Sequence, residues 1–406
     1  MNIALLHYAA PPVVGGVETV LARQAQQLKR SGHHVLILTG RGQMWDVNIP
    51  VRILPHLDSR FPKVLRLKSD LDHGVVPDGF SEMVEQIQND LKRHFEGIDV
   101  LIAHNVASLH KNLALTAALH NLSQLQNSPR VILWHHDLAW STMRYRDELH
   151  SGWPWDLLRN HWPGVRQVTV SKTRQQELAT LMGLDEDEIK VVPAGLDVQD
   201  FLGLHNRTVP FLDKLDLLMS APIILTPVRI TRRKNLELAI QTMAVVIEKM
   251  PDSILVITGP PGAHNPANKK HFKKLHKLRN KLNLEGKVHF MADFAAEGLP
   301  DVSVADFYRL ADVLLIPSRE EGFGIPILEA GISRMPIFCS DIPQLRALAG
   351  DAATYFSPDD LPEYIAGLIV HRMISDSVYQ WRVKVRREYT WEAIYKNQIA
   401  PLLEFE

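Results

Sequence analysis

One stretch of the chain runs Val313-Leu-Leu-Ile-Pro-Ser-Arg-Glu-Glu-Gly-Phe-Gly-Ile-Pro-Ile-Leu-Glu-Ala330. Its first four residues are continuously apolar, which predicts a buried strand of a parallel sheet. Proline is well tolerated in the first turn of a helix, so we expect a helix to begin near Pro326. Gly322 and Gly324 remove side chains from the turn between them, where the backbone can approach a ligand closely. The stretch therefore predicts an α/β fold with a ligand at a strand-to-helix turn.

The same turn is suited to an anion. The N–H groups of Phe323, Gly324 and Ile325 lie at the expected helix start, where the helix dipole favours negative charge, so we expect them to bind a diphosphate. Glu329 lies one turn into the helix, from where a carboxylate can accept hydrogen bonds from two vicinal hydroxyls, as in a ribose. Glu321 lies in the preceding loop, within reach of a sugar. Glycine-rich turns with acidic neighbours also occur in α/β proteins that have no such ligand.

Strands and helices alternate on both sides of this stretch, as is typical of parallel sheets. In the first part of the chain we expect strands at 3–7, 35–39, 100–104, 131–134, 167–170 and 190–192, and in the second part at 223–226, 254–258, 288–290, 313–316 and 337–339. An irregular polar segment separates the two sets. We therefore expect domains at 1–200 and 201–385, with residues 386–406 forming a helix that packs across the domain junction.

The composition narrows the class of protein. A chain of 406 residues is too long for one ordinary core. Its net charge of -1, from 45 basic and 46 acidic side chains, provides no global field for nucleic acid. Cys339 is the single cysteine, which suits a reducing compartment, and no apolar run reaches the roughly 20 residues of a membrane helix. We expect a cytoplasmic protein.

A basic segment, Pro227-Val-Arg-Ile-Thr-Arg-Arg-Lys-Asn235, follows the first strand of the second domain. Arg229 can offer a pyrophosphate a forked set of donors, and Lys234 can offer it a point charge. With these cations we expect neither a metal nor a cofactor. Arg232 and Arg233 are as well explained as solvated residues at a helix start.

Together with Gly15-Gly16-Val17-Glu18, these motifs resemble glycosyltransferase family 4 over nearly the whole chain. The resemblance implies the GT-B architecture, which has two facing Rossmann-like domains with a catalytic cleft between them. It also implies retaining transfer from a nucleotide sugar. By the family's pattern Glu321 binds the donor sugar and Glu329 the ribose, Arg229 and Lys234 bind the pyrophosphate, and Gly15 and Gly16 form the glycine loop.

Two further positions follow from the resemblance. The family commonly has a histidine followed by Asp or Gly near the transferred sugar, and Trp134-His-His-Asp137 aligns His136 with it, although a slip of one residue selects His135. Segment 258–268 is similar to a phrase found near the donor site in some members, so Gly259 either lines that site or belongs to a loop stiffened by proline. Glu321, His136, Arg229 and Lys234 are the expected catalytic residues.

The expected reaction moves a hexosyl unit from a UDP-, GDP- or ADP-sugar to a hydroxyl of a saccharide, polyol or lipid-linked acceptor. The alternative is a noncatalytic nucleotide-sugar-binding or regulatory protein of the same fold. Basic stretches at 60–68 and 269–281 are explained either as solvated helix faces or as peripheral contacts with anionic lipid at the inner face of the membrane.

Overall fold

The computed structural model describes residues 1–262 and 265–404, and it divides the chain into two compact units. The first unit runs from Met1 to Leu196 and resumes at Tyr389, and the second runs from Asp197 to Glu388. The first division thus lies between Leu196 and Asp197, whereas residue 200 was expected. The structure assigns the C-terminal segment to the first unit. This segment starts at Tyr389, three residues after residue 386, where the C-terminal helix was expected to start.

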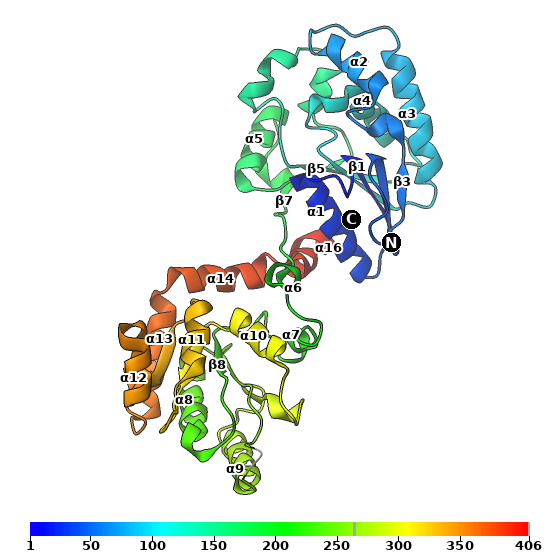
Figure 1. The fold of residues 1–406 in the computed structure, drawn as a ribbon. Coiled ribbons are helices and arrows are strands. Elements are labelled where there is room, and N and C mark those ends of the chain that lie inside the picture. Colours follow the sequence, from blue (N-terminus) through cyan, green and yellow to red (C-terminus); the bar gives the residue numbers. More distant parts are fainter. Residues whose placement is uncertain (263–264, 405–406) are drawn as a thin grey trace. The chain divides into compact units, whose positions relative to one another are not determined.

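The first unit is built on a parallel sheet of seven strands in the order β3-β2-β1-β4-β5-β6-β7 (Figure 1). The strands are β1 (Asn2–Ala9), β2 (His34–Arg41), β3 (Val51–Ile53), β4 (Val100–His104), β5 (Arg130–His135), β6 (Arg166–Thr169) and β7 (Ile189–Val191). The main helices are α1 (Gly16–Arg30), α2 (Pro62–Leu71), α3 (Phe80–Phe95), α4 (Leu113–Ser123) and α5 (Lys172–Met182).

Both faces of this sheet are buried, which explains why its central strands are continuously apolar. Side chains of β1 point alternately to the two faces. Ile3 and Leu5 pack in one cluster with residues of α1 such as Leu21, whereas Ala4 and Leu6 pack in another with residues of α3 and α4. The helices therefore cover the sheet from both sides.

The C-terminal segment packs on the first unit. It forms α15 (Trp391–Ile394), a π-helical turn (Tyr395–Ile399) and α16 (Ala400–Leu403). Trp391 and Ile394 join the cluster that contains Leu21 of α1, and Figure 1 shows this segment beside α1. A Cβ at Gly195 would lie 2.6 Å from Trp391 Cδ2, so the absent side chain at Gly195 lets the segment dock.

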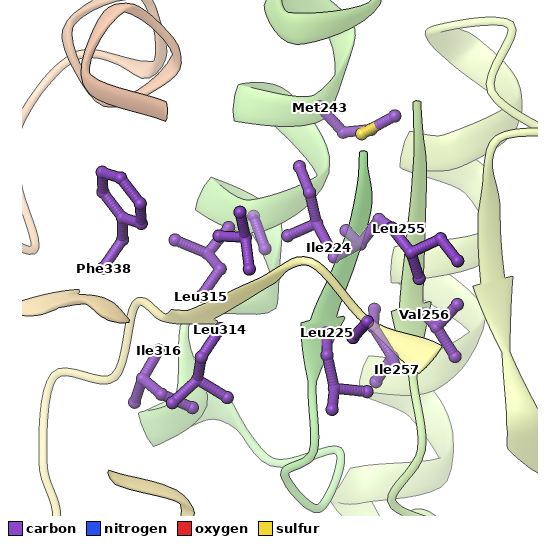
Figure 2. Packing of buried hydrophobic residues seen from close by; sticks show 14 of the residues in the cluster. Ile224, Leu225, Met243, Leu255, Val256, Ile257, Leu314, Leu315, Ile316 and Phe338 are labelled. Carbon is purple, nitrogen blue, oxygen red and sulfur yellow. The ribbon is translucent and has the colours of Figure 1, made fainter. Parts of the chain in front are cut away.

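The second unit has a parallel sheet of six strands in the order β10-β9-β8-β11-β12-β13. These are β8 (Ile223–Thr226), β9 (Ile254–Ile257), β10 (Val288–Phe290), β11 (Val313–Ile316), β12 (Ile337–Ser340) and β13 (Ala353–Phe356). Its helices are α6 (Val198–Leu202), α7 (Pro210–Lys214), α8 (Leu236–Lys249), α9 (Ala267–Lys281), α10 (Asp301–Leu310), α11 (Ile325–Ile332), α12 (Pro343–Ala349), α13 (Pro362–Ser375) and α14 (Ser377–Glu388). Figure 2 shows Ile224, Leu255 and Leu315 of its central strands packed in one core.

The structure confirms the predicted α/β class and every expected strand, and it adds two. Strands β3 and β13 lie at sheet edges and were missed because they are short and only partly buried, so they lack an apolar run. The strand order reverses direction between β1 and β4 and again between β8 and β11. Ligands of open α/β sheets bind beyond the carboxyl ends of the strands at such reversal points.

Among the described residues, no helix is long and apolar enough to cross a membrane.

Candidate active site

An ion pair lies beyond the carboxyl ends of β8 and β11. Lys234, at the end of a 3₁₀ turn (Arg232–Lys234), places Nζ 2.5 Å from Glu321 Oε1, and Ser318 Oγ donates to the same oxygen over 2.7 Å. The Arg319 N–H donates to the Arg233 carbonyl over 2.8 Å, which ties the two loops together. The structure therefore brings together two of the four residues expected to be catalytic, from motifs far apart in the sequence.

A pocket of about 450 Å³ adjoins this ion pair. Three cationic side chains, Arg229, Arg233 and Lys234, contribute to its wall. Within the described part of the chain none of its lining residues is acidic, and these residues are Pro227, Val228, Arg229, Thr231, Arg233, Lys234, Gly262, Asn265, Asn268 and Pro326. The pocket has the charge and the size expected for a diphosphate-bearing ligand.

The glycines before α11 have different roles. Gly324 is the N-cap residue of α11 with φ +104°, and a Cβ there would lie 2.7 Å from Leu345 Cδ2, so this position requires glycine. A Cβ at Gly322 would meet nothing within 4 Å, so the space beside it is open. Phe323 and Ile325 are more than half exposed. The first hydrogen bond of the helix runs from the Ile327 N–H to the Gly324 carbonyl, so the N–H groups of Phe323, Gly324 and Ile325 precede it and can bind an anion.

Glu329 has a partner that the sequence did not indicate. The Tyr308 hydroxyl, on α10, donates a hydrogen bond to Glu329 Oε2. Burial and the hydrogen bond to Glu329 raise the pKa of Tyr308, so its hydroxyl keeps its proton. Glu329 itself is exposed, and Tyr308 holds one of its carboxylate oxygens. Because the two residues lie on separate helices, no local pattern could have paired them.

Gly259 allows two loops to approach each other. A Cβ at this residue would lie 2.2 Å from the Val228 carbonyl oxygen and 2.6 Å from the Arg229 nitrogen. Its missing side chain therefore lets the loop after β9 pack on the loop that carries Arg229. Residues 263 and 264 of the segment 258–268 lie outside the described residues.

In the first unit, the glycine loop ends at α1. Gly15 is the N-cap residue of α1 in an extended conformation, and a Cβ there would lie 2.1 Å from Glu18 Oε2. The Glu18 side chain thus folds back over Gly15, with Oε1 3.9 Å from His7 Nε2. Gly16 has open space where its side chain would be.

The structure distinguishes between the two adjacent histidines. His135 ends β5 fully buried, and its Nε2 lies 2.8 Å from Gln167 Oε1 in the interior. His136 is half-buried in the loop that follows, with Nε2 3.1 Å from His104 Nδ1. Burial lowers the pKa of each to about 4, so both imidazoles are neutral at neutral pH. Of the two, His136 is the more exposed.

Asn105 fixes the backbone of this loop. It has φ +58°, and its Oδ1 accepts hydrogen bonds from the N–H groups of His136 (2.7 Å) and Asp137 (3.2 Å). Sequence reasoning missed Asn105, His7 and His104. All three lie at the carboxyl ends of β1 and β4, and that position in an alternating α/β pattern is the signal that could have found them.

One group of side chains in the described part of the chain has the composition of a metal site. Ligand atoms of Asp72, His110 and Glu148 lie within 4.8 Å of one another. However, Lys68 Nζ lies 2.5 Å from Asp72 Oδ2 and 2.9 Å from Glu148 Oε2, so the ammonium group of Lys68 already pairs with both carboxylates. Hydrogen bonds from Lys68 and His110 lower the pKa of Glu148. The group is an ion-pair network.

Two family models match the chain. "Glycosyltransferase Family 4" matches residues 14–200 and "Glycosyl transferases group 1" matches residues 212–375. Among curated proteins, a mannosylglucosylglycerate synthase of Petrotoga mobilis is 26% identical over 366 residues, covering 84% of this chain and 83% of its own length. A D-inositol 3-phosphate glycosyltransferase of Kineococcus radiotolerans is 29% identical over 191 residues, covering 46% of this chain and 42% of its own.

Solved structures align along the whole chain at low similarity. The Anabaena protein HepE in complex with UDP and glucose is 16% identical, with a TM-score of 0.36, and the match covers 99% of this chain and 98% of that one. A sucrose-phosphate synthase from Thermosynechococcus elongatus is 18% identical, with a TM-score of 0.36 and coverage of 99% and 98%.

Proposed function

We infer the reaction of this protein from its family, because the chain belongs to glycosyltransferase family 4 and is a glycosyltransferase of the GT-B fold. We propose that it is a retaining enzyme that moves a hexosyl unit from a nucleoside diphosphate sugar to a hydroxyl group of its acceptor. The proposal includes no metal and no cofactor.

The observation that carries this proposal is the Lys234–Glu321 pair beside a cationic pocket. Transfer of a sugar from a nucleotide requires stabilisation of the negative charge that builds up on the departing diphosphate. Arg229, Lys234 and the N–H groups of residues 323–325 at the start of α11 would supply it. Glu321 would bind hydroxyls of the sugar, and Glu329, held by Tyr308, would bind the ribose.

In the proposed step, the bond between the anomeric carbon and the phosphate oxygen breaks, and its electron pair goes to the phosphate. The acceptor oxygen bonds to the anomeric carbon from the same face, and its proton moves to the departing phosphate oxygen. Glu321 is a weak candidate for a nucleophile because Lys234 and Ser318 both bind its Oε1. This contact supports a reaction without a covalent glycosyl-enzyme intermediate, in contrast to retaining glycosidases.

We propose a saccharide or a polyol as the acceptor, contacted by the first unit. Support comes from the relatives' names, since one is a mannosylglucosylglycerate synthase and the other acts on D-inositol 3-phosphate. UDP-, GDP- and ADP-sugars all remain donor candidates.

The test combines a panel of UDP-, GDP- and ADP-hexoses with saccharide and polyol acceptors, and measures release of nucleoside diphosphate. We expect release from one donor that depends on an acceptor, and a product whose anomeric configuration, determined by NMR, equals that of the donor. Inversion would refute retention, and release from no donor in the panel would refute the donor class. Glu321→Gln should abolish transfer, so full transfer by this variant would refute the assignment of Glu321.

A peripheral contact with anionic lipid is a separate proposal. Helix α9 exposes Lys269, Lys270, Lys273, Lys274, Lys277 and Lys281 and contains no acidic residue. By contrast, Lys68 in the other basic stretch is occupied by Asp72 and Glu148. Cosedimentation with anionic but not with neutral vesicles, lost in Lys273→Glu/Lys277→Glu, would support the contact, and equal sedimentation with both would refute it.

A further inference from the structure

His104 is the buried neighbour of the site histidine. It is the last residue of β4, and the sheet register pairs it with Trp134 of β5. The chain leaving β5 therefore places His136 beside it, with 3.1 Å between His104 Nδ1 and His136 Nε2 and 5.4 Å between the ring centroids. The distance is that of a hydrogen bond between two ring nitrogens.

Both rings are neutral at neutral pH. Burial, reinforced by the neighbouring histidines, lowers the pKa of His104 well below its ordinary value, and burial lowers that of His136 to about 4. A neutral imidazole carries one N–H donor and one acceptor nitrogen. The hydrogen bond between the two rings therefore contains one proton, bound either to His104 Nδ1 or to His136 Nε2. The choice between these two donors determines the tautomer of both rings.

Two arrangements are possible. If His136 Nε2–H donates, the proton of His104 must lie on its own Nε2, and the free nitrogen of His136 is an acceptor. If His104 Nδ1–H donates, His104 Nε2 is a lone pair, and His136 carries its proton on Nδ1. His104 Nε2 is buried and has no hydrogen-bond partner in the described part of the chain. Among buried main-chain groups, orphaned N–H groups are rarer than undersatisfied acceptors, and the same preference applied to this ring nitrogen favours the second arrangement.

The surroundings hold His104 in place for this role. His7 Nδ1 lies 2.8 Å from the His104 carbonyl oxygen, so His7 donates there and fixes the end of β4. The side chain of Asn105, the next residue, accepts a hydrogen bond from the main-chain N–H of His136 and so holds the backbone there. The partners of His136 are thus set from both its ring and its main chain.

We propose that His104 is a positioning residue that fixes the tautomer of His136, so that His136 presents an Nδ1–H donor to an oxygen of the substrate. This inference rests on the proposed function for the identity of the substrate, but the tautomer is a property of the free protein. It also excludes His136 as the base for the acceptor proton, because Nε2 is occupied and Nδ1 already carries a proton.

The first test reads the tautomer directly. In the full-length protein labelled with ¹⁵N at histidine, long-range ¹H–¹⁵N correlations at pH 7.5 show which ring nitrogen carries the proton, and the spectrum of His136→Asn identifies the signals of His136. We expect protonated Nδ1 and unprotonated Nε2 at His136. The reverse pattern, or a mixture of both, would overturn the proposal. The result does not depend on any activity, so it remains interpretable if the proposed reaction is wrong.

The second test uses matched substitutions. An asparagine amide can place an N–H near the position of histidine Nδ1, whereas a glutamine amide reaches the position of Nε2. His136→Asn should therefore retain more kcat than His136→Gln. His104→Asn keeps a donor for His136 Nε2 and should retain kcat, whereas His104→Leu should lower it by about 3- to 10-fold, the effect of one neutral hydrogen bond.

A merely structural role for His104 predicts a different result. In that case His104→Leu would leave the protonated nitrogen of His136 unchanged, and the two His104 variants would lose kcat equally. Either outcome would refute the positioning role. If no variant or wild-type protein transfers sugar with any donor, the proposed function fails while the NMR result still decides the tautomer.

Discussion

Lys234 Nζ lies 2.5 Å from Glu321 Oε1, and the two side chains are only 10% and 7% exposed. They are separated by 87 residues in the sequence and follow two different strands. In a buried ion pair of this kind the attraction between the charges largely offsets the free energy of removing them from water, so the net stabilisation is small. Removing one partner is strongly destabilising, because the other charge stays buried and unpaired. The pair therefore links the stability of the second unit to the residues that we assign to the donor.

Removing one partner of this pair should destabilise the second unit more than removing both. We expect Lys234→Met and Glu321→Leu each to lower the free energy of unfolding by about 3 to 5 kcal/mol, and the double variant to recover part of that loss. Denaturant unfolding measures this, and all three variants should lack transferase activity. Arg229→Met is the matched control. Because Arg229 is exposed, this substitution should change the free energy of unfolding by no more than about 0.5 kcal/mol, although it should weaken donor binding. Additive losses in the double variant would contradict the pairing.

Tyr308→Phe should weaken binding of the donor nucleotide with little effect on kcat at saturating donor. The hydroxyl orients Glu329, and its loss corresponds to about one hydrogen bond, or roughly a 3- to 10-fold rise in Kd. Calorimetric titration with the nucleoside diphosphate checks this, and Glu329→Gln should have an effect at least as large. An unchanged Kd in Tyr308→Phe would show that Glu329 does not need this partner.

Asn105 should be more sensitive to alanine than to glycine. Both substitutions remove the acceptor for the N–H groups of His136 and Asp137, which should lower the free energy of unfolding by about 1 to 3 kcal/mol. Alanine must also adopt φ +58°, which costs a non-glycine residue roughly 1 to 2 kcal/mol. Asn105→Gly should therefore unfold at a higher denaturant concentration than Asn105→Ala, while both lose kcat. Equal midpoints would argue against the strained backbone.

The first unit should lose stability as the pH falls from about 6.5 toward 4. Burial lowers the pKa of His7, His135 and His136 to about 4, so in this window the unfolded chain binds protons that the folded chain does not. Stability then rises with pH, by at most about 1.4 kcal/mol per pH unit for each histidine. Unfolding curves between pH 4.5 and 7.5 measure the slope. His135→Asn, which removes one such group, should flatten it, and an unchanged slope would contradict the assignment.

Much of the fold could be predicted from local pattern, because parallel strands buried on both faces are apolar throughout. The central strands β1, β4, β8 and β11 were predictable for this reason. The edge strands β3 and β13 were not, since they are only partly buried and their residues form no continuous apolar run. The turn and the helix start that carry Gly324 and Glu329 were predictable because they belong to one motif.

By itself, the sequence determined the α/β class, the two sets of strands and the glycine-rich turn that begins α11. These depend on interactions between residues close in the chain: periodicity, turn conformation and helix capping. Only the tertiary structure decided that Lys234 pairs with Glu321, that Tyr308 holds Glu329, and that His136 is more exposed than His135. Those contacts depend on which strands are neighbours and on their register, and neither is encoded in any local stretch.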